Sequence, residues 1–295
     1  MQANMRRIVS ILLAVMFCVA CFTGCGSSKD NGGTASVDVR NAKSIADLAG
    51  AKIAAQTGTF HADALEQIPN VQASTYPEFS DLLTALKSGA IDGYVAEEPT
   101  AVDACAQDSS LGYIKLKNND TGFRVTGDDN GIAIGLKKES GLTAQINAIL
   151  AEKVPASVQS ALMEQIFAIC KNPDTEQNLT LALRSDNTDT SNGTLRVGME
   201  CAYNPFNWSQ TTDANGAVKY GDGLYANGYD VQVAKFIAAE LGMKLEIVRY
   251  EFDSLITAVQ SGNVNAIIAG MSPTEREIDF TACYYKSELV IIYKK

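Results

Sequence analysis

The residues best suited to bind a small molecule stand at the ends of predicted strands. Two of these ends carry Gln56-Thr57-Gly58-Thr59 and Ala96-Glu97, and two others carry Glu200 to Trp208 and Ala269-Gly270-Met271-Ser272. Ligands of open α/β sheets bind beyond the carboxyl ends of the strands. We therefore expect these carboxylates, hydroxyls and aromatic rings to face one another across a cleft.

Other kinds of chemistry are not indicated. His61 is the only histidine, so a catalytic triad is not predicted. We expect this side chain to cap or pack at the start of a helix, with a ligand contact as the other interpretation. Asp128-Asp129-Asn130 lacks the alternating spacing of a calcium loop and is typical of a turn. The chain has no phosphate loop, GxGxxG or CxxC motif, and we expect no metal and no cofactor.

The elements that must position these strand ends are revealed by an internal repeat. Residues 79–96 and 252–269 align without a gap and share Phe, Leu, Thr, Ala, Ser-Gly and a final Ala. In each copy the apolar residues first follow a helical period. Gly89 or Gly262 then suits the left-handed conformation that ends a helix. A nearly continuous apolar run follows, which is typical of a buried parallel strand.

A similar strand-helix-strand unit precedes each copy of the repeat. The chain is therefore predicted to form two lobes with an α/β fold, each a mostly parallel sheet flanked by helices, with a ligand cleft between them. The preceding units are predicted as strand 52–56, helix 61–67 and strand 71–76, and as strand 194–199, helix 230–241 and strand 244–250.

The N-terminus is typical of a secretory signal. A basic start precedes the apolar run Ile8–Cys21, which is shorter than the ~20 residues of a membrane span. Small residues up to Cys25 resemble a bacterial lipobox, which implies lipidation of Cys25 and a lipid anchor on the outer face of the membrane. The alternative is a plain signal peptidase site near Ala20.

Composition bounds the remaining possibilities. The chain has 295 residues, of which 46% are hydrophobic, enough to bury a core. Its net charge of −10 makes nucleic acid an unfavourable partner. Past the signal, the cysteines are widely spaced, and the sequence does not choose between one disulfide and the favoured interpretation of four thiols. These cysteines are Cys105, Cys170, Cys201 and Cys283.

Several stretches together resemble the type II periplasmic solute-binding proteins of ABC importers, specifically the polar amino-acid group. The second half of the chain resembles the N-terminal part of that family, and the first half resembles its C-terminal part. The matching stretches are Thr194-Leu-Arg-Val-Gly-Met-Glu, Tyr203-Asn-Pro-Phe-Asn-Trp, Gly228-Tyr-Asp-Val-Gln-Val-Ala-Lys, Ala269-Gly-Met-Ser-Pro-Thr-Glu-Arg, Ile278-Asp-Phe, Ile45-Ala-Asp-Leu-Ala-Gly, Ala55-Gln-Thr-Gly-Thr, Ile91-Asp-Gly-Tyr-Val-Ala-Glu and Gly131-Ile-Ala-Ile.

The resemblance implies roles for residues in the cleft. Arg276 matches the family's carboxylate-binding arginine, and Glu97 matches its acid for the α-ammonium group. Glu200 stands where several relatives place an acid near the ligand side chain, so it favours a cationic amino acid only weakly. The full set of implied ligand-binding residues is Gln56, Thr57, Gly58, Thr59, Glu97, Glu200, Tyr203, Phe252, Ala269, Gly270, Ser272 and Arg276.

The reversed order of the two halves resembles a circular permutation cut at one crossover between the lobes, which would leave a single covalent crossover. A chain cut from a tandem array and a swapped dimer are the alternatives. The interpretation divides the chain into a signal peptide (1–25), a tether (26–41), lobe 2 (42–129), a crossover hinge (130–137), the first part of lobe 1 (138–172), a polar linker (173–192), the second part of lobe 1 (193–287) and a crossover-like strand (288–295).

The function implied is that of a lipid-anchored, extracytoplasmic binding protein rather than an enzyme. It would capture an amino acid by closure of its lobes and deliver it, as a monomer, to an ABC permease in the membrane. Two alternatives stay open: a cyclohexadienyl-dehydratase-like enzyme on the same fold, and an extracytoplasmic amino-acid sensor domain. The sequence does not name the amino acid.

Overall fold

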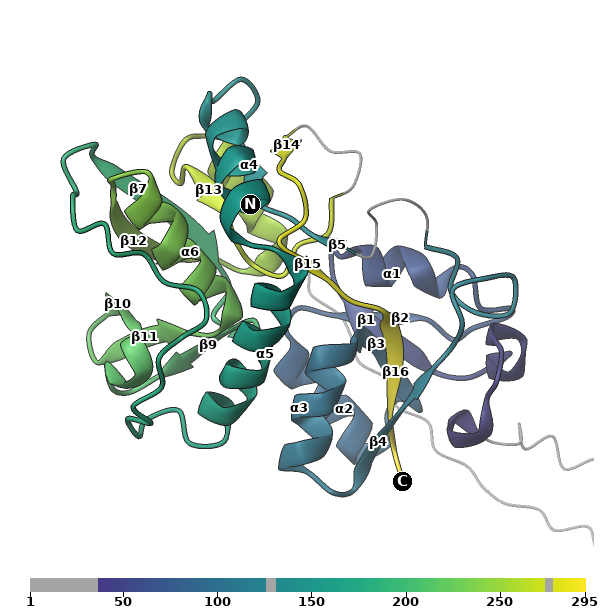
Figure 1. Cartoon of the computed structure of the whole chain (residues 1–295). Coiled ribbons are helices and arrows are strands. Elements are labelled where there is room, and N and C mark those ends of the chain that lie inside the picture. The colour runs from purple at the N-terminus through teal and green to yellow at the C-terminus, as the bar shows by residue number, and fades with distance from the viewer. Residues whose placement is uncertain (1–36, 126–130, 274–277) are drawn as a thin grey trace, which may run out of the picture. The chain divides into compact units, whose positions relative to one another are not determined.

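The computed structural model describes residues 37–125, 131–273 and 278–295 (Figure 1). The predicted signal, Cys25, the Asp128-Asp129-Asn130 turn and Arg276 lie outside these residues. None of the helices in the described part of the chain is both long enough and apolar enough to cross a membrane.

Lobe 2 is built on a five-stranded sheet with the order β2-β1-β3-β16-β4. The three strands β2, β1 and β3 are parallel, and β16 is antiparallel to both of its neighbours. The elements of this lobe are η1 (Val39–Asn41), η2 (Ile45–Leu48), β1 (Ile53–Gln56), α1 (Phe60–Leu65), β2 (Ser74–Tyr76), α2 (Phe79–Ser88), β3 (Gly93–Glu97), α3 (Glu98–Gln107), β4 (Leu111–Lys115) and β16 (Leu289–Lys294).

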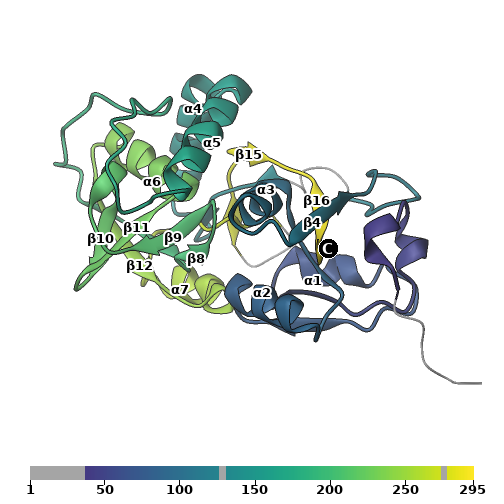
Figure 2. The ribbon, with the colours of Figure 1, turned by 90° about the horizontal axis from the view of Figure 1, so that it is seen from below.

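Lobe 1 repeats this plan with the sheet order β12-β7-β13-β6-β14, in which β6 is the antiparallel strand. Figure 2 shows α4, α5 and α6 beside one another on this lobe. Its elements are β6 (Gly135–Leu136), α4 (Leu142–Lys153), α5 (Ala156–Cys170), β7 (Thr194–Met199), α6 (Tyr229–Glu240), β12 (Lys244–Arg249), η4 (Phe252–Ser254), α7 (Leu255–Gln260), β13 (Ala266–Ile267) and β14 (Asp279–Phe280).

A small antiparallel sheet, in the order β10-β11-β9-β8, is inserted into lobe 1 between β7 and α6. It carries the aromatic side chains that follow β7 in the sequence. Its elements are β8 (Ala202–Tyr203), β9 (Asn207–Gln210), η3 (Ala214–Gly216), β10 (Val218–Gly221) and β11 (Leu224–Asn227).

The prediction of a single crossover is wrong, because the chain passes between the lobes twice. The two passages pair as β5 (Gly131–Ile132) and β15 (Tyr285–Lys286). β5 continues into β6 of lobe 1, and β15 continues into β16 of lobe 2, seen in yellow between β3 and β4 in Figure 1. β16 is held there because its apolar residues 289–292 are buried among the strands on either side.

The repeated segment folds as its pattern predicts. α2 buries the apolar face formed by Phe79, Leu82 and Leu86, and it ends at Gly89 with φ 77°, in the left-handed region. Because a side chain is strained in that conformation, glycine ends the helix at low cost. The two-lobed α/β fold class predicted from the sequence is confirmed.

The polar segment predicted as a linker is held against lobe 1. Leu183 is buried, and the Asn187 amide donates to the Ala239 carbonyl at 2.6 Å. At its start, Asp174 accepts hydrogen bonds from the backbone N–H groups of Thr211 and Thr212. Side-chain hydrogen bonds thus hold this segment, which has no periodic apolar face. Because such bonds leave no pattern in the sequence, its polar composition alone suggests a loose connection.

Candidate functional site

A narrow cavity lies between the lobes, at the carboxyl ends of strands from both sheets. Its volume is only about 10 Å³, roughly the room for one water molecule, so the cavity is nearly closed in this arrangement of the lobes. Seven of the predicted ligand-binding residues line it: Gln56, Thr59, Glu97, Tyr203, Phe252, Gly270 and Ser272. Phe60, His61 and Met271, which were not in that set, line it as well. The fold therefore brings most of the predicted set together.

Glu97 is a buried carboxylate that ends β3, with only 3% of its surface exposed. Its Oε1 lies 2.9 Å from Nε2 of His61, which is also buried. The other two polar atoms of this pair, Glu97 Oε2 and His61 Nδ1, are buried and lack a hydrogen-bond partner among the described residues. Because such orphaned atoms are costly, the pair is suited to a ligand that supplies the missing contacts.

Glu200 is a second buried carboxylate beside the cavity, and it follows β7 in lobe 1. It does not line the cavity itself, but its partner Gln56 does. The Oε2 atom of Glu200 accepts a 2.6 Å hydrogen bond from Nε2 of Gln56 in lobe 2, while its Oε1 has no described partner. Burial raises the pKa of Glu200 to about 8, although the bond from Gln56 acts in the opposite direction. A cation placed beside Oε1 would favour the charged form and offset the cost of burial.

Aromatic rings form the walls of the cavity. Tyr203 and Phe252 line it, and the hydroxyl of Tyr203 is buried without a described partner. Phe79 of lobe 2 stacks on Tyr203, with the ring centroids 4.0 Å apart and the planes 12° from parallel. Gly270 has φ 63°, and a Cβ there would lie 2.8 Å from the Tyr203 ring. Only glycine therefore lets this backbone lie against the ring.

A buried hydrogen-bond network fixes the segment that follows β13. Asp230 accepts from the Gly270 backbone N–H, from Tyr284 Oη at 2.6 Å and from Asn207 Nδ2 at 2.8 Å. Burial raises the pKa of Asp230 to about 6, and these donors oppose that rise. This network fixes the strand end that carries Ser272.

The loop after β1 has a more local role than predicted for some of its members. Thr59 caps α1, because its Oγ1 accepts from the Ala62 N–H at 3.3 Å and donates to the Gln56 carbonyl at 2.7 Å. Thr57 is half-buried, and Gly58 is exposed beside Asp253 of lobe 1. Thr57 and Gly58 do not line the cavity, and neither does Ala269, which is fully buried.

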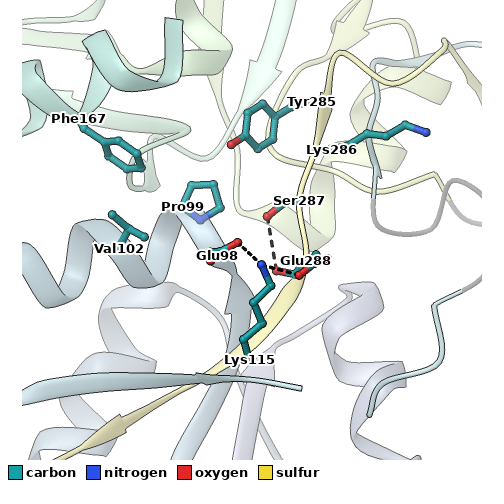
Figure 3. Close-up of a pocket in the computed structure, with 9 residues that line it drawn as sticks. All are labelled: Glu98, Pro99, Val102, Lys115, Phe167, Tyr285, Lys286, Ser287 and Glu288. Atoms are coloured by element: carbon teal, nitrogen blue, oxygen red, sulfur yellow. Dashed lines mark hydrogen bonds and ion pairs between the residues drawn. The ribbon is translucent and has the colours of Figure 1, made fainter. Parts of the chain in front are cut away.

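A more open depression lies where the crossover enters lobe 2 (Figure 3). Pro99, Val102 and Phe167 form its apolar side. Two lysines line it, and one of them, Lys115, lies 2.9 Å from a carboxylate oxygen of Glu98 and 2.6 Å from one of Glu288. Because these charges are already paired and are well exposed, the depression lacks the unpaired buried groups of the narrow cavity.

Two features of the narrow cavity were not predicted. One is the His61–Glu97 pair, which joins residues 36 positions apart. The other is Phe79, whose ring stacks on that of Tyr203. The internal repeat offered a signal for Phe79, because Phe79 and Phe252 are equivalent positions of its two copies. His61 was singled out as the only histidine, with a ligand contact as its second interpretation, but nothing in the sequence indicated its pairing with Glu97.

Comparison with known families agrees with this geometry. Residues 195–295 match the model for bacterial extracellular solute-binding proteins, family 3. Over these residues, which make up about a third of the chain, the sequence is similar to that family. The matched segment supplies Glu200, Tyr203, Phe252 and the 269–272 strand end, and the family's extracellular character agrees with the predicted extracytoplasmic location.

Individual curated proteins match this chain over only part of their own lengths. The arginine-binding extracellular protein ArtP of Bacillus subtilis is 33% identical over 39% of this chain and 42% of its own length. The L-arginine-binding protein of Pseudomonas aeruginosa is 31% identical over 40% of this chain and 42% of its own. This chain thus spans about two fifths of the curated relatives that it matches.

A solved structure is similar over a comparable share. The arginine-bound substrate-binding protein AbpA of Streptococcus pneumoniae is 33% identical over 29% of this chain and 32% of that chain, with a TM-score of 0.25.

Proposed function

We propose that this protein binds an amino acid with a cationic side chain between its lobes. The observation that carries the proposal is a pair of buried carboxylates, Glu97 and Glu200, each with one oxygen that lacks a described partner. A cationic amino acid brings two positive groups. Its α-ammonium would pair with Glu97 Oε2, and its side-chain cation would pair with Glu200 Oε1. The arginine-binding descriptions of the relatives support this assignment.

The aromatic walls fit the same ligand. Tyr203 and Phe252 present rings to the cavity, and a guanidinium or ammonium group is attracted to the face of such a ring. The ligand carboxylate would be held by the Gly270 and Ser272 strand end and by Arg276, whose planar fork suits a bidentate contact. Arg276 is assigned on the sequence resemblance alone.

Ligand binding would favour the closed arrangement of the lobes, because both lobes contribute to the cavity. The closed arrangement is already supported by contacts that span the lobes. Arg249 Nη2 lies 2.8 Å from Glu78 Oε1, and Gln56 donates to Glu200. The exposed Arg249 pair contributes little, whereas the buried Gln56–Glu200 bond contributes more.

In the cell, this binding would serve import. We place the protein as a lipoprotein anchored through Cys25 to the outer face of the bacterial membrane, from which it delivers the amino acid to an ABC permease. The lipobox-like N-terminus supports the anchor, and the similarity to family 3 supports the transport role.

The order of the lobes is proposed to be a circular permutation of the family's order. We expect the chain without residues 1–25 to be a monomer in light scattering and to bind one amino acid per chain. The physical reason is that β16 completes the sheet of lobe 2 within the same chain. A dimer that binds ligand would contradict this expectation and favour a swapped assembly, and a monomer that binds none would contradict the permutant.

A thermal-shift screen against the twenty amino acids tests the ligand class. We expect arginine or lysine to raise Tm by roughly 5–10 °C at a hundred times its Kd, because that occupancy adds about 2.7 kcal/mol of stability. Agmatine, which is arginine without its carboxylate, is the matched control and should give a much smaller rise.

Equal shifts with neutral amino acids would contradict the assignment of Glu200 to a cation. If no amino acid raises Tm, binding itself is contradicted. Turnover of prephenate-like acids would then favour the dehydratase alternative. That enzyme would need a general acid aimed at a leaving group, for which Glu97 or Glu200 is the available side chain.

A further inference from the structure

A second cavity between the lobes meets the candidate site at the Phe79–Tyr203 stack. Residues of helices α2 and α3 of lobe 2 line it, together with Ala202 and Asn204 of lobe 1. Figure 2 shows these two helices beside β8 of lobe 1. Phe79 lines this second cavity, and its stacking partner Tyr203 lines the first. The two cavities therefore share a wall that forms only when the lobes are together.

The second cavity contains a buried carboxylate without a cationic partner. Asp103 on α3 has 6% of its surface exposed and lines the cavity. Gln107 Nε2 donates to it at 2.6 Å, and the Cys170 thiol of lobe 1 also hydrogen-bonds to it. No ion pair to Asp103 exists within the described residues, and Lys87, the lysine of this cavity, is paired with Asp108 at 2.7 Å. Acceptor capacity on the carboxylate therefore remains, since its two oxygens offer about four lone-pair sites.

Two further features point to a ligand beside Asp103. Thr100 lies one helical turn earlier on the same face of α3, is 7% exposed, and its Oγ1 is buried with no described partner. The rings of Phe79 and Tyr94 also line the cavity, and aromatic faces attract cations. Leu83 supplies apolar surface for the body of a ligand.

We propose that this second cavity binds a small organic cation, an ammonium group on an apolar body, with Asp103 as its charged partner and Thr100 as its hydrogen-bonding partner. Because both lobes line the cavity, its ligand favours the same closed arrangement as the amino acid. The two ligands then strengthen each other's binding by equal factors. This coupling rests on the proposed function, whereas the site itself does not.

The test uses hexylammonium as the probe and hexanol as its uncharged match. Both are titrated by ligand-observed NMR against the protein with and without saturating arginine. Hexylammonium is expected to bind in both cases, more tightly with arginine, and hexanol at least tenfold more weakly. Asp103→Asn should weaken hexylammonium binding at least tenfold. Thr100→Val, which keeps the side-chain shape, should weaken it several-fold.

Asp81→Asn is the matched control, because Asp81 is an exposed acid on α2 and does not line the cavity. It should bind hexylammonium like the wild type, and all variants should keep the wild-type Tm within a few degrees. The site is overturned if hexanol binds as well as hexylammonium, or if Asp103→Asn and Thr100→Val both bind normally. Displacement of hexylammonium by arginine would place the probe in the amino-acid cavity and would also overturn it. Failure of arginine to bind would leave the probe experiment intact and would contradict only the proposed function.

Discussion

Replacing Glu97 by glutamine should weaken amino-acid binding at least 100-fold. The carboxylate is buried, and in the proposed complex its Oε2 meets the ligand ammonium group. Glutamine keeps the shape and still presents an oxygen to His61, but it removes the charge. Leaving one partner of a buried ion pair uncompensated costs about 3–5 kcal/mol. Calorimetric titration with the amino acid that the screen identifies measures the effect.

The neighbouring residue provides the control for this substitution. Glu98 is adjacent in sequence, but it is partly exposed and already paired with Lys115 at 2.9 Å. Glu98→Gln changes the net charge identically and should alter affinity less than threefold. Glu97→Gln should also keep the ligand-free Tm, since His61 retains an acceptor. Wild-type affinity in Glu97→Gln would remove Glu97 from the ligand site.

Replacing Glu200 by glutamine should stabilise the ligand-free protein at pH 8 while it weakens binding of the cationic ligand. The pKa of Glu200 is raised by burial to about 8, above that of an unfolded glutamate. Between about pH 4.5 and 8, the folded state therefore holds a proton that the unfolded state releases. Stability falls as pH rises through this window, by about 3–5 kcal/mol for this group.

Asp230 acts in the same direction, because burial raises its pKa to about 6. The stability that Asp230 contributes at low pH is lost as the pH rises, and this loss is complete by about pH 6. The loss is the same in the wild type and in Glu200→Gln. The difference in free energy of unfolding between these two proteins therefore isolates Glu200. We expect that difference to be small at pH 5 and to grow to several kcal/mol by pH 8, where Tm of the variant should be roughly 5–15 °C higher.

Urea unfolding at a series of pH values measures this difference. Glu246→Gln is the control, because Glu246 is an exposed acid on β12 of the same lobe and should leave the pH dependence unchanged. In the wild type, the cationic amino acid should bind more tightly at pH 8 than at pH 6, because it pairs with the ionised form. A pH-independent difference between wild type and Glu200→Gln would contradict the account of Glu200.

Much of the architecture was predictable from local patterns. The strand β7 was predicted with its observed bounds, and the 79–96 and 252–269 repeat predicted equivalent helix-strand units in both sheets. These features are local, since an apolar period of 3.6 or a short buried run is written into consecutive residues. The strand ends then follow, and with them most of the cavity lining.

The extent of the crossovers was not predictable in the same way. The apolar residues of the segment 289–294 predict a buried strand. Its position between β3 and β4 depends on residues nearly two hundred positions earlier in the sequence. The sequence pattern of a strand predicts which of its faces are buried, but it does not predict which strands lie beside it in the sheet. The interpretation of a single crossover failed for this reason.

The sequence by itself determined two sheets, their repeated units and the set of polar strand ends. Only the tertiary structure decided how the charged groups are matched. It joins Glu97 to His61 and Glu200 to Gln56, the latter across 144 residues of sequence. It also buries Asp103 beside the second cavity. Pairing and burial set which carboxylate oxygens lack a partner and how far the pKa of Glu200 moves, and both are properties of neighbours in space that no local spacing encodes.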